Sequence, residues 1–212
     1  MKKITNLELI DFAKSKLGVP YVYGCKGEKL TIEKYNTLKQ RYGSNCVWDS
    51  DVNKVGKVCC DCSGLIQWAT GVALGSYQLY ERAYQKELIS TIDKAPLGAL
   101  VWQRGHVGIY IGNGEYIAED GSAFGCRINK LSKAKFTHWL LMDYIDYSSK
   151  DQKDKKEGEE VVEKSKIIVD NKEINVERIL KDGSNFIKIR DIAESLGYDI
   201  ESKGNIAVLK KR

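Results

Sequence analysis

The segment VCCDCSGLIQWATG, residues 58–71, places a cysteine where a helix would begin. Asp61 can cap that helix, so Cys62 would lie in its first turn, where free backbone N–H groups and the helix dipole favour a thiolate. Ser63 and Gly64 leave room for a substrate and for backbone donors that would face an oxyanion. The pattern predicts that Cys62 is a nucleophile.

A thiolate nucleophile needs a partner base, and the chain contains two histidines. His106 begins the alternating segment HVGIYIGNG, in which Val107, Ile109 and Ile111 would face the core and leave His106 on the other face of a strand. His138 lies among aromatic residues in another predicted strand, where a structural role is the better interpretation. His106 is therefore the predicted general base.

The remaining cysteines are interpreted as packing residues. Cys59 and Cys60 precede the predicted helix and would be buried as small apolar side chains. A zinc site built from Cys25, Cys46, Cys59 and Cys60 is the alternative, but their spacing contains no C-x-x-C pair. Free thiols and no metal or other cofactor are expected.

Hydrophobic periodicity and turn signals predict the elements that must position these residues. The first half is predicted to contain a helix over 4–17, with Asn6 as N-cap and Gly18 as stop, followed by an extended segment over 18–24. An insertion over 28–57 follows, with a helix at 28–43 and a loop at 49–57, and then a helix over 61–69 that is closed by Gly71. The remaining elements are a hairpin over 98–121 with an Asn113-Gly114 turn and a closing strand over 135–147. Helices followed by antiparallel strands favour an α+β fold.

A run of charged and small polar residues divides the chain. We predict an N-terminal domain over 1–147, a solvated charged linker over 148–165 and a small C-terminal module over 166–212. The module has a strand–turn–strand, helix, strand pattern. Its predicted core includes Phe186, Ile187, Ile189, Ile192, Leu196 and Tyr198.

Composition excludes several classes of function. The longest apolar runs are only a few residues long, far short of the roughly 20 residues that span a bilayer. The net charge of +5 is spread without an arginine-rich stripe, so no nucleic-acid partner is predicted. Glu8 and Asp11 interrupt the place where the apolar core of a secretory signal would run, so the expected location is the cytoplasm.

The segments PYVYG, DCSGL and HVGIYIGNG, in this order and at this spacing, resemble the NlpC/P60 family of papain-like cysteine peptidases over residues 4–147. The resemblance implies a papain-like fold with Cys62 as nucleophile and His106 as general base. It also implies that the hydroxyl of Tyr21 lies near the nucleophile.

The same resemblance implies a substrate. Asp61 and Ser63 would help to hold the peptide stem of peptidoglycan, and the bond cut would be either the one between D-glutamate and the diamino acid or the N-acetylmuramoyl-L-alanine amide. No cofactor is implied.

The third catalytic position departs from the family pattern. The family places His, Asn, Gln or Glu twelve residues after the base, and Ala118 stands there in this chain. A tight two-residue turn would pair His106 with Gly121 and bring Glu119 onto its face, whereas a register shifted by one residue would place Asp120 opposite His106. The family spacing implies the second register and favours Asp120, with Glu119 as the alternative.

The segment DGSNFIKIRDIAESLGYDI resembles small repeats of cell-surface proteins and of the wall-binding regions of phage lysins. Together with the absence of a secretory signal, this favours a modular peptidoglycan hydrolase of the endolysin type, held in the host cytoplasm until a holin opens the membrane. The alternatives are a thiol acyltransferase or amidase acting on a small amide, and a non-catalytic wall-binding protein.

Overall fold

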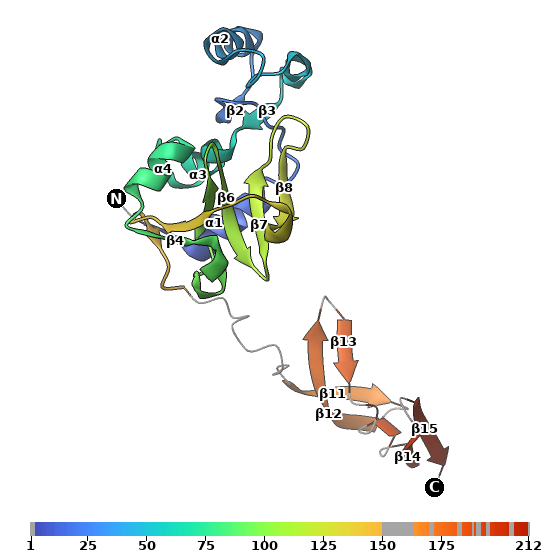
Figure 1. The fold of residues 1–212 in the computed structure, drawn as a ribbon. Helices are drawn as coiled ribbons and strands as arrows, with labels where there is room; N and C mark the ends of the chain where they lie inside the picture. The colour runs from blue at the N-terminus through green and yellow to red at the C-terminus, as the bar shows by residue number, and fades with distance from the viewer. Residues whose placement is uncertain are drawn as a thin grey trace. The chain divides into compact units, whose positions relative to one another are not determined.

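The computed structural model describes residues 3–149, 163–169, 172–181, 184–187, 189, 192–193, 196–203 and 206–211. They belong to two compact units, residues 1–151 and 152–212 (Figure 1). The first strand of the second unit, β11 (Glu163–Val169), begins inside the segment predicted as linker. Residues 150–162 of that linker lie outside the described residues.

The first unit is built on an antiparallel sheet with strand order β4-β9-β5-β6-β7-β8. The strands are β4 (Gln85–Leu88), β9 (His138–Leu141), β5 (Leu100–Gln103), β6 (His106–Gly112), β7 (Glu115–Glu119) and β8 (Cys126–Lys130). The closing strand predicted over 135–147 is divided into β9 and the short β10 (Ile145–Asp146), which pairs in parallel with β1 (Ile4–Thr5).

Each face of this sheet has its own apolar layer. Helices α1 (Asn6–Lys14) and α3 (Cys62–Thr70) pack on the face that carries Val107, Ile109 and Ile117. The opposite face carries an aromatic layer of Tyr110, Tyr116, Phe136 and Trp139, next to the 3-10 turns η2 (Ile89–Lys94) and η3 (Leu131–Lys133). Helix α4 (Ser76–Arg82) adds Leu79 to the first layer.

Helix α1 begins one residue earlier than the sequence predicts. Its N-cap is Thr5, whose hydroxyl accepts the N–H of Glu8 while the Glu8 carboxylate accepts the N–H of Thr5, a complete capping box. Asn6, the predicted cap, lies inside the helix and is buried, where its amide donates to Leu97. The helix also ends at Lys14, short of Leu17, which is exposed.

Helix α3 follows its predicted boundaries closely. Asp61 is the N-cap, and its carboxylate accepts the N–H of Gly64 at 2.6 Å. Gly71 ends the helix in the left-handed conformation. Gly64 is required by a close approach, because a Cβ at this position would lie 2.4 Å from the carbonyl oxygen of Cys25. The strand–helix junction that presents Cys62 is thus fixed by local signals.

The insertion forms a lobe beside the sheet, at the top of Figure 1. It consists of β2 (Lys26–Lys29), α2 (Ile32–Tyr42), η1 (Asp49–Lys54) and β3 (Val58–Cys60). Its own core includes Leu30, Tyr35 and Leu38. The predicted loop over 49–57 was wrong in its first part, because Asp49–Lys54 forms a 3-10 helix in which the Asp51 carboxylate accepts the N–H of Trp48 at 2.8 Å.

The β6–β7 hairpin turns at Asn113 and Gly114, both with positive φ, as a tight hairpin turn requires. Tyr110 pairs with Tyr116 and Gly112 pairs with Glu115, so Ile111 is an extra residue on β6. This β-bulge shifts the register by one residue relative to a regular ladder. Asp120 is therefore the residue that lies opposite His106.

The second unit contains five described strands in two sheets. One sheet has the order β11-β12-β13, and the other pairs β14 with β15. The bounds are β12 (Lys172–Lys181), β13 (Ser184–Ile187), β14 (Tyr198–Lys203) and β15 (Ile206–Lys211). The predicted helix between β13 and β14 lies mostly outside the described residues. Ile189 and Leu196, predicted as core, are exposed, whereas Val176 and Ala193 are buried.

In the part of the chain that the structure describes, no helix is both long and apolar enough to cross a membrane.

Candidate active site

Cys62 and His106 meet where the N-terminus of α3 approaches the start of β6. The Cys62 side chain lies close enough to the His106 imidazole to raise the pKa of the ring, although the two residues are far apart in the sequence. Cys62 is 6% exposed, and the His106 side chain is 21% exposed, so both are largely shielded and still open to a substrate. The His106 ring stacks on Phe136, with centroids 5.6 Å apart and planes inclined by 11°.

Asp120 orients the imidazole. Its Oδ1 lies 3.1 Å from the Nε2 of His106, and with Nε2 as donor the other ring nitrogen, Nδ1, is left for the Cys62 thiol. Its Oδ2 accepts the Nε–H of Arg127 at 2.7 Å, and the hydroxyl of Tyr116 lies 3.4 Å from both oxygens. The Asp120 side chain is only 6% exposed, so these contacts fix it in place.

This arrangement favours a charged imidazolium. Burial alone would lower the pKa of His106, but the hydrogen bond to Asp120, the neighbouring Cys62 and the negative charge of Asp120 raise it to about 9. Burial alone would raise the pKa of Asp120, but hydrogen bonds from His106 and Arg127 outweigh it and lower that pKa below its ordinary value. The site therefore holds a proton on His106 at neutral pH.

Glu119, the alternative to Asp120, points away from His106. It is fully buried, and neither of its carboxyl oxygens has a hydrogen-bond partner among the described residues. Burial, followed by the negative charge of Asp61, raises the pKa of Glu119 to about 9, with Lys54 acting in the opposite direction. Glu119 is therefore a protonated core residue at neutral pH.

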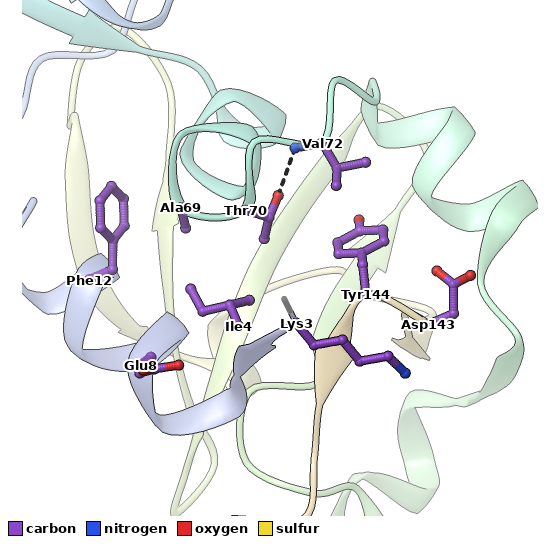
Figure 2. Close-up of a pocket in the computed structure, with 9 residues that line it drawn as sticks. All are labelled: Lys3, Ile4, Glu8, Phe12, Ala69, Thr70, Val72, Asp143 and Tyr144. Carbon is purple, nitrogen blue, oxygen red and sulfur yellow. Dashed lines mark hydrogen bonds between the residues drawn. The ribbon is translucent and has the colours of Figure 1, made fainter. Parts of the chain in front are cut away.

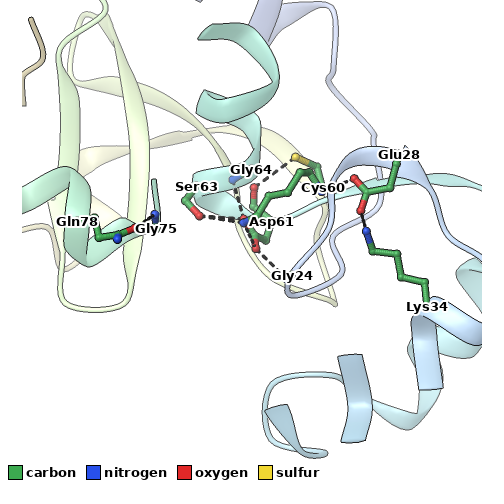
Figure 3. A network of polar contacts seen from close by, with 10 residues as sticks. Gly24, Glu28, Lys34, Cys60, Asp61, Ser63, Gly64, Gly75 and Gln78 are labelled. Carbon is green, nitrogen blue, oxygen red and sulfur yellow. Dashed lines mark hydrogen bonds and ion pairs between the residues drawn. The ribbon is translucent and has the colours of Figure 1, made fainter. Parts of the chain in front are cut away.

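Asp61 and Ser63 belong to a polar network at the start of α3 (Figure 3). The Asp61 carboxylate accepts the backbone N–H groups of Gly24 and Gly64 and the hydroxyl of Ser63. It also pairs with the ammonium of Lys26, at 2.7 and 2.6 Å to its two oxygens. Asp61 therefore directly precedes the nucleophile, and both of its carboxylate oxygens accept hydrogen bonds from within the protein. Contact of Asp61 and Ser63 with a substrate stays a prediction.

Tyr21 lies beside the nucleophile. Its backbone forms an isolated parallel β-bridge with Cys60. The pKa of the Tyr21 hydroxyl is raised, first by burial and then by the neighbouring Cys62 and Asp61. Its hydroxyl therefore keeps its proton and can act as a donor. The residues that the resemblance placed around Cys62, namely Tyr21, His106, Asp61 and Ser63, are all gathered at this end of the sheet.

Sequence reasoning missed a lysine that joins the insertion to the site. Lys54 donates to the carbonyl oxygens of Tyr21 and Ser122, at 2.7 and 2.8 Å, and pairs with Asp51 at 2.6 Å. Asp51 is fully buried and also accepts the Ser122 hydroxyl. Lys54 thereby holds together the loop of Tyr21 and the loop that follows Asp120. Its partners lie 33 and 68 residues away, so no local sequence signal could have revealed them.

The other cysteines pack. Cys59 and Cys60 are fully buried, as is Cys25, and all six cysteines are free thiols. Burial is the first cause that raises the pKa of Cys59 to about 11 and of Cys25 to about 12, so these thiols stay protonated. Among the described residues, no group of three or more His, Cys, Asp or Glu side chains is placed to hold a metal ion.

The described part of the first unit contains a groove at the candidate site and a pocket elsewhere. A groove of about 320 Å³ starts at His106 and Asp120. A larger pocket of about 560 Å³ lies beside α1 and the end of α3, where Tyr144 and Thr70 line it (Figure 2). None of the predicted site residues lines the larger pocket, whereas His106 and Asp120 line the groove.

Residues 18–144 match the NlpC/P60 family, and this range includes Cys62, His106 and Asp120. Because the match spans more than half of the chain, the protein belongs to the NlpC/P60 family, whose members are cysteine peptidases and amidases that act on peptidoglycan. The predicted α+β, papain-like fold class is confirmed.

Solved structures similar to this chain include the peptidoglycan hydrolase RipB from Mycobacterium tuberculosis, at 23% identity and a TM-score of 0.45. That alignment covers 66% of this chain and 65% of RipB, slightly less than two thirds of the latter. The P60 domain of an antigen from M. avium subspecies paratuberculosis aligns at 24% identity and a TM-score of 0.46, over 66% of this chain and 94% of that domain. A comparison with curated proteins gives no match.

Proposed function

We propose that this protein hydrolyses an amide bond in the peptide stem of peptidoglycan by a cysteine mechanism. The observation that carries the proposal is the connected set Cys62–His106–Asp120, in which one imidazole contacts the thiol and the carboxylate. RipB, one of the similar solved structures, is itself a peptidoglycan hydrolase. Ala118 was the only sequence feature that favoured a non-catalytic binder, and Asp120 supplies the acceptor that Ala118 lacks.

In the first half of the reaction, the Cys62 sulfur attacks the amide carbonyl carbon while its proton resides on His106. The negative charge on the carbonyl oxygen lies near the N-terminus of α3, where the N–H groups of Cys62 and Ser63 have no acceptor among the described residues. The C–N bond then breaks as His106 gives its proton to the leaving amine, which leaves a thioester on Cys62.

In the second half, water attacks the thioester carbonyl and His106 takes one of its protons. The C–S bond breaks, which releases a carboxylic acid and restores the thiolate–imidazolium pair. Asp120 keeps the imidazole in the orientation and tautomer that both halves require.

Digestion of purified peptidoglycan tests the proposal. We expect the wild-type protein to release fragments that mass spectrometry detects, and Cys62→Ala to release none, because the thioester cannot form without the thiol. The fragment masses identify the bond, either between D-glutamate and the diamino acid or at N-acetylmuramoyl-L-alanine.

Cys59→Ala is the matched control, because Cys59 is a buried thiol three residues away that contacts no reacting group, and it should digest like the wild type. If the wild type releases nothing from walls of several chemistries, the hydrolase proposal is wrong. If Cys62→Ala digests as well as the wild type, the cysteine mechanism is wrong.

The biological setting of the enzyme is where it resides and how it reaches the wall. We infer that the enzyme acts as an endolysin, which remains in the host cytoplasm until a holin-type pore gives it access to the wall. The support is the resemblance of the C-terminal segment to wall-binding repeats, since such a unit would raise the concentration of the enzyme at the wall. Lysis of producing cells only when a holin is co-expressed would support this setting, and lysis without a holin would contradict it.

A further inference from the structure

The groove beside His106 is lined by an unusual set of charges. Its wall includes Arg127 from β8, and Lys133 and Lys135 from the segment that follows β8. Gln103 and Asn129 add neutral polar groups. Among the described residues, Asp120 supplies the one carboxylate that lines the groove, and it already accepts hydrogen bonds from Arg127 and His106.

Two of these cations are free. Lys133 and Lys135 are exposed, and neither forms an ion pair or a hydrogen bond within the described part of the chain. Lys26, Lys39 and Lys54 of the same unit, by contrast, each pair with an aspartate. Two unpaired ammonium groups beside a neutralised Asp120 give the groove a local excess of positive charge, which attracts anions.

The chemistry of the reaction determines which part of a substrate lies there. His106 must give its proton to the leaving amine, so the leaving portion has to lie against the imidazole. His106 itself lines the groove, whereas Cys62 does not, so the groove begins on the Asp120 side of the imidazole. A leaving portion that passes along the edge of the ring, a distance that one residue of an extended chain spans, would reach the groove.

We propose that this groove is a binding site for a carboxylate on the leaving portion of the stem peptide, held by Lys133 and Lys135. The inference rests on the proposed function and adds a preference to it. Stem peptides that carry a free carboxylate on the leaving side are preferred over the same peptides with that carboxylate amidated. A leaving portion with a free ammonium group instead is disfavoured by repulsion.

The test uses two synthetic stem peptides that differ only in one carboxylate or carboxamide on the leaving side of the bond that wall digestion identifies. We expect kcat/KM to be about 3- to 10-fold higher for the carboxylate, the range for partly exposed ion pairs. The ratio should shrink as the salt concentration rises, because exposed charges are screened. Lys133→Gln/Lys135→Gln should bring the ratio close to one.

The matched control is Lys14→Gln/Lys94→Gln, which removes the same charge from two exposed lysines outside the groove and should keep the preference. Equal cleavage of both peptides by the wild type would overturn the inference while leaving the proposed hydrolase intact. The same conclusion would follow if the Lys133→Gln/Lys135→Gln variant kept the full ratio.

Peptide binding to an inactive variant tests the inference without any catalysis. The Cys62→Ala protein should bind the carboxylate peptide more tightly than its amide by calorimetry, and Lys133→Gln/Lys135→Gln in that background should abolish the difference. Equal affinities for the two peptides would overturn the inference. Failure of the hydrolase proposal would appear elsewhere, as the absence of any cleavage of wall or peptide by the wild-type protein.

Discussion

Replacing Asp120 by asparagine is expected to lower kcat/KM for wall peptides by about 10²- to 10⁴-fold while leaving the fold intact. Asp120 accepts a hydrogen bond from the Nε2 of His106, and an asparagine can present its NH₂ group there instead, which would favour the tautomer with the proton on the wrong nitrogen. The loss should appear mainly in kcat, because Asp120 lies behind the imidazole and acts through it.

The same substitution should move the pH profile. In the wild type, kcat/KM should fall as the pH rises through about 9, because above that value His106 loses the proton that it must give to the leaving amine. Asp120 is one of the groups that raise this pKa, so the alkaline limb of Asp120→Asn should lie at lower pH. Initial rates measured from pH 6 to pH 10.5 for the wild type and for Asp120→Asn locate the alkaline limb of each protein.

Tyr116→Phe is the control for this experiment, because its hydroxyl lies 3.4 Å from the Asp120 oxygens and contributes little to their position. We expect less than a roughly threefold change in kcat/KM for it, given the weakness of a hydrogen bond of this length. An Asp120→Asn variant with wild-type activity, together with an inactive Glu119→Gln variant, would exchange the roles assigned to the two acids.

Glu119→Gln is expected to stabilise the protein at neutral pH. The folded-state pKa of Glu119 is about 9, against 4.5 ordinarily, so between these values the folded protein holds a proton that the unfolded chain has released. Stability therefore decreases as the pH rises through this window, by up to about 1.4 kcal/mol per pH unit. Glutamine has a similar shape and no proton to lose, so it removes this dependence.

The gain in unfolding free energy should be close to zero near pH 4 and on the order of 4 kcal/mol near pH 7.5, which lies three pH units above the ordinary pKa of 4.5. This corresponds to a Tm higher by roughly 8–15 °C at the upper pH. Urea unfolding monitored at pH 4.5, 6 and 7.5 measures the difference. Activity should be unchanged, since Glu119 contacts neither Cys62 nor His106.

Glu115→Gln is the matched control for stability, because Glu115 lies on the same strand, β7, but is partly exposed and close to the turn. It should change the unfolding free energy by less than about 0.5 kcal/mol at every pH. A Glu119→Gln variant that is less stable than the wild type at all three pH values would show that the buried carboxyl has an ionic partner and is not a neutral core group.

The features that sequence reasoning predicted well are those fixed by short-range chemistry. Asp61 as N-cap and Gly71 as C-cap define α3, and Asn113 with Gly114 defines the hairpin turn, because caps and tight turns depend on the residue at one position. The start of α1 was missed by one residue because Thr5 and Asn6 are both good caps, and only Thr5 can form a capping box with Glu8.

The features that it missed depend on contacts between distant segments. Nothing near Lys54 or Lys26 in the sequence indicates that their ammonium groups reach Ser122 and Asp61, or that these contacts join the insertion to the site. The family spacing favoured Asp120 over Glu119, but no residue signal identified the bulge that brings Asp120 opposite His106. In each case the tertiary fold, and not a local preference, decides which groups meet.

The bulge at Ile111 limits how this hairpin can change in length. If a hairpin of the same length paired without the bulge, His106 would lie opposite Gly121, so that Glu119 would join the face of His106 and Asp120 would enter the core with the helices. The apolar residues of β7 would also change layers, with Tyr116 and Ala118 moving from the aromatic layer to the helical one. Relatives that keep both the bulge and an acid on the imidazole should therefore gain or lose residues between the histidine and that acid in pairs, whereas relatives without the bulge should lack one residue there. An alignment of the hairpin would reveal this constraint.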